Sequence, residues 1–140
     1  MKYKARSRAM ARREGKDLVL PLSPAATYGS QIAPLPTRTL PVLLPSYFAP
    51  SHQNRTVRVV APQGMGWSEL PPGGDANGGD FGKAHIELAR DPKDPRALVI
   101  KRSVVFNQHL IPVDKYAAWR KWVQDVDALM HKEIRLVEAK

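Results

Sequence analysis

The 140-residue chain has no cysteine and no long uninterrupted apolar run. Without cysteine, disulfides, thiolate metal ligands and cysteine nucleophiles are all excluded. Because no stretch reaches about eighteen apolar residues, the sequence predicts no transmembrane helix. The basic N-terminus is not followed by the apolar segment of a signal peptide, because charged residues interrupt positions 9–22. The sequence therefore points away from a thiol enzyme, a disulfide scaffold and a membrane-spanning protein.

Proline, glycine and positive charge are abundant instead. Thirteen prolines and nine glycines divide the chain into short pieces, which argues against an all-helical fold. The length predicts a single domain, residues 1–140, large enough for one hydrophobic core. The formal net charge is +9, and most of the excess lies early: residues 1–70 hold ten Lys/Arg and three Asp/Glu.

Near the C-terminus, residues 112–132 carry the clearest structural signal of the chain. Apolar side chains recur there at steps of three and four, which predicts an amphipathic helix. Pro112 stands at the expected start, where its missing N–H would have no partner. We expect the apolar stripe to cover a sheet; a groove for a partner is the alternative. The stripe consists of Tyr116, Trp119, Val123, Val126 and Met130. Residues 133–137 then alternate as a closing strand.

At the other end of the chain, Tyr3 to Met10 alternates between basic and small or aromatic residues, which predicts a strand with one basic face. Together with Asp17 to Leu22, it predicts a hairpin. The basic face could be an interaction surface, for a protein or for phosphates. Alternatively, its charges simply discourage pairing at a sheet edge. The face consists of Lys2, Lys4, Arg6 and Arg8.

Between the two ends, alternating patterns predict further strands at 55–61, 83–89 and 97–111. Residues 23–50 hold six prolines and predict an ordered, Pro-rich connection that lies on the domain. Residues 71–82 predict a Gly-rich loop. The expected fold is mainly β: an antiparallel β-sandwich or curled sheet with one C-terminal amphipathic helix and a closing strand.

Residues with catalytic or metal-binding chemistry are scattered along the chain. His85 and Glu87 share one face of a predicted strand, but a zinc site needs three or four ligands and nothing else matches the pattern. The serines fit no nucleophile signature. We therefore expect no catalytic residue, no metal and no cofactor, and no enzymatic activity.

Four passages also resemble a known group of bacterial proteins. They are a strand ending in Pro and Gly before an aromatic and Leu-Pro (Val57 to Pro71), Phe-Gly ahead of a strand (Phe81 and Gly82), Ile-Pro-x-Asp-x-Tyr (Ile111 to Tyr116), and a helix with Val-Asp (Val126 and Asp127). The order resembles the C-terminal region of multidomain proteins that carry a DUF3857-type domain followed by a transglutaminase-like domain.

That resemblance implies a β-sandwich accessory domain that packs on a neighbouring domain or positions substrate for it. The family's catalytic Cys-His-Asp set lies upstream, so no catalytic residue carries over to this chain. The resemblance also implies the bacterial cell envelope or periplasm, although a cytoplasmic place is not excluded. The expected partner is a protein or an adjacent domain of the same polypeptide. A stand-alone interaction module within a larger assembly is the alternative, and nucleic-acid binding is the weakest hypothesis.

Overall fold

A computed structural model of the chain describes residues 11–22 and 27–139. In this part the fold is mainly β, with antiparallel sheets, as the sequence predicts. The strands are β1 (Arg12–Glu14), β2 (Asp17–Pro21), β3 (Val42–Leu43), β4 (Ser51–Val60), β5 (Met65–Trp67), β6 (Gly74–Asn77), β7 (Gly82–Asp91), β8 (Asp94–Phe106), β9 (Leu110–Ile111) and β10 (Glu133–Glu138). The helices are α1 (Tyr28–Ile32), α2 (Tyr116–Met130) and the short 3-10 turns η1 (Gly79–Phe81) and η2 (Val113–Lys115).

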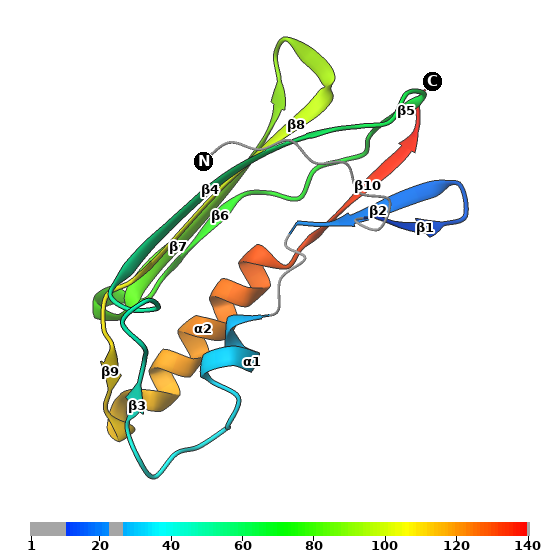
Figure 1. The fold of residues 1–140 in the computed structure, drawn as a ribbon. Helices are drawn as coiled ribbons and strands as arrows, with labels where there is room; N and C mark the ends of the chain where they lie inside the picture. Colours follow the sequence, from blue (N-terminus) through cyan, green and yellow to red (C-terminus); the bar gives the residue numbers. More distant parts are fainter. Residues whose placement is uncertain (1–10, 23–26, 140) are drawn as a thin grey trace.

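The main layer is a long four-stranded sheet in the order β4-β8-β7-β6. The helix α2 lies against one face of this sheet, next to β6 and β7 (Figure 1). We call this face the inner face and the opposite one the outer face. Buried side chains alternate along β7 and β8, including Ile86, Ile100 and Phe106, because successive residues of a strand point to opposite faces. The core therefore lies between α2 and the inner face.

Two smaller sheets complete the fold. The closing strand β10 leaves the end of α2 and pairs with β2 and β5, giving the order β1-β2-β10-β5, which we call the small sheet (Figure 1). Trp67 of β5 joins the small sheet to the long one, because its indole Nε1 donates to the Arg96 carbonyl at 3.0 Å. At the opposite end of the molecule, β3 and β9 form a two-stranded sheet.

The five residues of the predicted stripe on α2 are all buried, at 3% exposure or less. The helix is shorter than the predicted 112–132. Pro112 precedes the 3-10 turn η2 with an extended backbone, and α2 proper begins at Tyr116. Within the described residues, no helix combines the length and apolar character that crossing a membrane requires.

The prediction of a loop over the Gly-rich residues 71–82 is wrong in part, because β6 and η1 lie within it. Two of the glycines are required because parts of the chain that are distant in sequence pack closely against them. A Cβ on Gly78 would lie 2.7 Å from the Trp122 indole, and one on Gly82 would lie 1.9 Å from the Val105 carbonyl oxygen. The φ of Gly82 is +147°, which L side chains rarely adopt. The edge strand β6 and the residues that follow it thus approach α2 closely. Trp122 Nε1 of α2 donates to the Ala76 carbonyl of β6 at 3.1 Å.

The Pro-rich connection 23–50 contains a helix that the sequence did not predict. Five residues are too few for a stable helix alone, and two side chains of α2 hold α1 at both ends. The Asp127 carboxylate accepts from the backbone N–H groups of Tyr28 and Gly29, each at 2.8 Å. Arg120 Nε donates to the Ala33 carbonyl at 3.3 Å. Asp127 and Arg120, which lie off the buried stripe of α2, therefore have a structural role in holding α1.

The predicted strand 97–111 is interrupted. β8 ends at Phe106, opposite Ser51 and Gly82, and the next backbone N–H, that of Asn107, donates to the Phe81 carbonyl. The chain then leaves the long sheet and pairs as β9 with β3. The predicted strand Asp17 to Leu22 is present as β2, but its hairpin partner is β1 (Arg12–Glu14), and the chain turns between them at Gly15 with φ +62°. The predicted strand from Tyr3 to Met10 lies outside the described residues.

Candidate functional site

A row of polar side chains crosses the outer face of the long sheet. His85 Nδ1 lies 2.7 Å from Asp75 Oδ1, and His52 Nε2 lies 3.1 Å from Ser103 Oγ. Asp75, His85 and Ser103 are direct cross-strand partners on β6, β7 and β8. The row thus contains the residue types of a Ser-His-Asp triad, brought together by strand register.

The setting of this row does not suit acyl transfer. The side chains of His85 and Asp75 are 50% and 75% exposed on an open sheet face. Acyl transfer needs N–H donors aimed at the developing oxyanion and a site that excludes water. The described surface has two shallow hollows, one beside the β7–β8 turn and one between β6 and α2. Asp75 lines the second, but neither His85 nor Ser103 lines either of them. Among residues 11–22 and 27–139, no three His, Cys, Asp or Glu gather to hold a metal.

The second surface lies at the end of the molecule that β3 and β9 form. Val42 and Ile111 pair across these strands and are buried, so their neighbours Leu43 and Leu110 face outward as a pair. Leu43 is 71% exposed and Leu110 is 48% exposed. Two large apolar side chains therefore stand side by side in solvent.

Other exposed apolar residues lie close to the leucine pair along the chain. Val113, in the turn η2 that follows β9 and leads into α2, is 42% exposed. Leu40 precedes β3 and is 69% exposed, and Tyr47 follows it and is 82% exposed. We call this set (Leu40, Leu43, Tyr47, Leu110 and Val113) the apolar end. All five lie on, or within four residues of, β3 or β9, and exposed large apolar side chains gathered in one region are typical of interaction sites.

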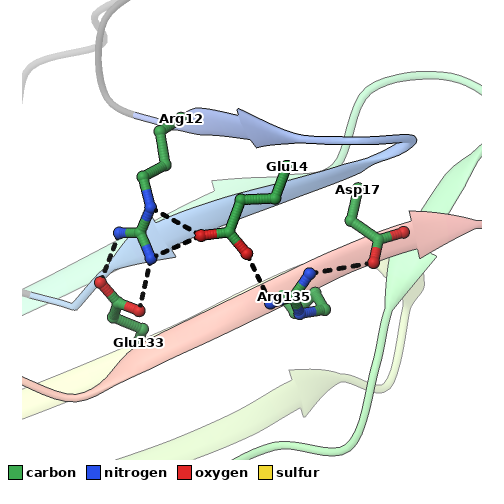
Figure 2. Close-up of polar contacts among 5 residues, drawn as sticks. All are labelled: Arg12, Glu14, Asp17, Glu133 and Arg135. Carbon is green, nitrogen blue, oxygen red and sulfur yellow. Dashed lines mark hydrogen bonds and ion pairs between the residues drawn. The ribbon is translucent and has the colours of Figure 1, made fainter.

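The small sheet, in contrast, carries a network of ion pairs on its exposed face (Figure 2). Arg12 pairs with Glu14 and Glu133, and Arg135 pairs with Glu14 at 2.7 Å and with Asp17 at 3.0 Å. The hydrogen bond from Arg135, followed by that from Arg12, lowers the pKa of Glu14 below its ordinary value. The hydrogen bond from Arg12 lowers the pKa of Glu133. Arg12 and Arg135 are therefore neutralised within the domain.

The predicted site residues fall into two groups. The basic residues Lys2, Lys4, Arg6 and Arg8 lie outside the described residues. The five stripe residues of α2 form the core beneath the sheet. The sequence analysis missed the apolar end, because residues 42–44 and 110–111 are wholly apolar and show no alternation that would tell a buried side chain from an exposed one. Which leucine faces outward depends on a pairing between segments that are 67 residues apart.

Comparisons with known proteins place this fold in a family. The model of the family described as "Domain of Unknown Function with solved-structure structure (DUF3858)" matches residues 17–136. The fold is similar to part of a crystal structure described as a "putative protease" from Parabacteroides distasonis ATCC 8503, with a TM-score of 0.64 and 15% sequence identity. The similarity covers 88% of this chain but 24% of that one, so the chain spans about a quarter of that protein's length.

A search of curated proteins finds no match. The family match is to DUF3858, and the link to DUF3857-type and transglutaminase-like proteins stays a prediction. The family model covers most of the chain, from the start of β2 to the middle of β10. On this ground, the chain belongs to the DUF3858 family of domains of unknown function.

Proposed function

We propose that the chain is a non-catalytic accessory domain that packs, through its apolar end, against an adjacent domain of a longer polypeptide. The observation that carries the proposal is the exposed pair Leu43 and Leu110 with its apolar surroundings. Burying a large aliphatic side chain contributes roughly 1.5–3 kcal/mol. A neighbouring domain that covers this end would therefore gain appreciable stability.

The fold comparison supports an adjacent domain as the occupant. This fold also occurs as about a quarter of a longer chain, so other parts of such a protein are available to cover the apolar end. By the sequence resemblance, the neighbour is a transglutaminase-like domain in the bacterial cell envelope or periplasm. That domain would supply the thiol chemistry for which this chain has no cysteine. The role of the present chain is then to pack on the neighbour or to position its substrate.

The first test is the size of the native polypeptide in its source cells, measured by immunoblot against this domain. The proposal expects a band several times larger than 15.6 kDa. A band at 15.6 kDa would overturn the accessory role and favour the alternative, a stand-alone protein-interaction module within a larger assembly.

A second test locates the contact by hydrogen exchange in the longer polypeptide and in the isolated 140-residue chain. The amides of β3 and β9 should exchange more slowly in the longer polypeptide. The double substitution Leu43→Glu with Leu110→Glu should remove that protection. Val60→Glu is the control, because Val60 is also exposed, at 44%, but lies at the far end of β4. Equal exchange in both proteins would contradict the contact.

The absence of catalysis is tested separately on the isolated chain. The open setting of Ser103 leads us to expect no hydrolysis of peptide or ester substrates. Activity that Ser103→Ala abolishes would overturn the non-catalytic role. Nucleic-acid binding stays the weakest alternative, because Arg12 and Arg135 are already paired with carboxylates. It would require binding of DNA or RNA that falls steeply with salt.

A further inference from the structure

The strand β4 forms a long edge of the main sheet. Its ten residues pair with β8 on one side, and no strand of the described chain pairs with the other. Such an edge presents a row of backbone N–H and C=O groups that can pair with another strand. Five successive residues of this strand, 52–56, are exposed. The edge is therefore open to an incoming strand.

Two arginines face each other across β4 and β8. Arg55 is the direct partner of Arg102, and Arg102 is in turn the partner of the buried Ile86 on β7. Because direct partners share a face, both guanidinium groups belong to the inner face. Arg55 is exposed and Arg102 is half-buried. None of the residues that the structure describes forms a hydrogen bond with the buried Nε of Arg102.

This arrangement is unfavourable for the isolated domain. Like charges directly opposite each other destabilise a sheet, and a buried donor without a partner loses the hydrogen bond that it would make to water. Burial, followed by the charge of Arg55, lowers the pKa of the Arg102 guanidinium. No carboxylate of the described residues forms an ion pair with either arginine, whereas Arg58 on the same strand pairs with Asp91 and Asp94. The pair lacks the anion that would offset it.

We propose that an extended acidic segment of a partner protein adds to the free edge of β4 and sets a carboxylate against Arg55 and Arg102. A residue opposite Arg55 on the added strand lies about 5 Å away between Cβ atoms, and a glutamate there reaches towards Arg102. The guanidinium group of an arginine can donate two parallel hydrogen bonds to one carboxylate. One carboxylate would thus offset the repulsion between the two guanidinium groups and accept a hydrogen bond from Arg102 Nε.

The rest of β4 specifies the segment further. Val57 and Val59 follow Arg55 on the inner face, opposite Ile100 and Leu98, and both are half-buried. The added strand would therefore carry an acidic residue followed or preceded, at alternate positions, by two apolar residues. A nucleic acid or a free phosphate would use the arginines but neither the valines nor the backbone edge. This surface is separate from the apolar end, so either proposal can fail without the other.

The probe is a labelled seven-residue peptide, Thr-Glu-Thr-Val-Thr-Val-Thr, together with its reversed sequence, because both strand directions are allowed. Binding to the 140-residue chain is measured by fluorescence anisotropy. One of the two peptides should bind at least about tenfold more tightly than its Glu-to-Gln counterpart, since hydrogen bonds to charged groups are worth about 1.5–3 kcal/mol. Amide exchange along β4 should slow on binding.

Variants assign the binding to the arginine pair. Arg55→Gln should weaken the glutamate peptide about tenfold and leave the glutamine peptide unchanged. Arg102→Gln should do the same without lowering the melting temperature, because the isolated domain gains nothing from that charge. The matched control is Arg58→Gln, on the same strand but the outer face, which should leave binding unchanged.

Three results would overturn the proposal. The first is equal binding of the glutamate and glutamine peptides, or no binding of either. The second is a large fall in melting temperature for Arg102→Gln, which would make Arg102 a structural residue. The third is binding of inorganic phosphate or an oligonucleotide that depends on both arginines while the peptides do not bind. That outcome would reassign the pair to a phosphate ligand.

Discussion

The half of the long sheet beneath α2 and the exposed face of the small sheet are stabilised by different means. The other face of the small sheet, with Leu20 and Ile134, belongs to the same apolar core as α2. Beneath α2, Trp119, Val123 and Val126 are at most 1% exposed. On the small sheet, the side chains of Arg12, Glu14, Glu133 and Arg135 form ion pairs while 40% to 53% exposed.

The difference shows where the free energy of folding originates. Apolar burial contributes about 25 cal/mol per Å², whereas exposed ion pairs contribute about 0–1 kcal/mol each. The close contact under α2 should therefore tolerate almost no change, and the exposed face of the small sheet should tolerate much. The following substitutions test that contrast, in order of decreasing expected effect.

The largest effect should come from Trp122, which is 4% exposed and contacts Gly78, Gly82 and Phe106. Trp122→Ala should lower the free energy of unfolding by about 3–5 kcal/mol, because it leaves a cavity under the helix. Trp122→Phe should lower it by less, about 1–3 kcal/mol, mainly because the Ala76 carbonyl loses its donor. Urea denaturation measures both. A loss under about 1 kcal/mol for Trp122→Ala would contradict the contrast.

Gly82→Ala should lower the free energy of unfolding by about 3 kcal/mol, because a Cβ there overlaps the Val105 carbonyl and the φ of +147° is strained. Gly66→Ala on the small sheet is the matched control. A Cβ at Gly66 meets nothing within 4 Å, so the change should stay within about 0.5 kcal/mol. Thermal denaturation of the two variants side by side makes the comparison. Equal effects would show that the two regions do not differ.

Asp127→Ala should lower the free energy of unfolding by about 1–2 kcal/mol, because the first N–H groups of α1 lose their acceptor. Hydrogen exchange should show α1 opening more readily. Asp125→Ala, two residues earlier on α2, is the control. Its pair with Lys121 is exposed and should contribute no more than about 0.5 kcal/mol. If both variants behave alike, Asp127 does not hold α1.

The smallest effect concerns pH and the small sheet. The pKa values of Glu14 and Glu133 are lowered in the folded chain from an ordinary 4.5. Their contribution to stability is therefore present above pH 4.5 and is lost as pH falls through the lowered values. Melting temperatures measured from neutral pH to about pH 3 should fall slightly less for Glu14→Gln with Glu133→Gln than for the unchanged chain. An unaltered pH profile would show that the network contributes nothing.

Prediction from sequence succeeded where the signal was local. The stripe on α2 repeats every three or four residues, and the strands alternate every two, so both could be read from neighbouring residues. The Gly-rich residues 71–82 were misassigned in part because Gly78 and Gly82 are required by close packing against Trp122 and Val105, which lie far along the chain. The helix α1 was missed because its stability comes from Asp127 and Arg120 on α2 rather than from its own five residues.

The sequence alone therefore determined the mainly β fold, the buried stripe of α2 and the exclusion of thiol chemistry. Each of these follows from composition or from periods of two and 3.6 residues. Only the tertiary structure decided that Leu43 stands beside Leu110, that Arg55 faces Arg102 and that β4 is an edge strand among the strands of the described residues. The physical reason is register. Which side chains become neighbours across a sheet depends on how distant segments pair, and a shift of one residue would turn every one of them to the other face.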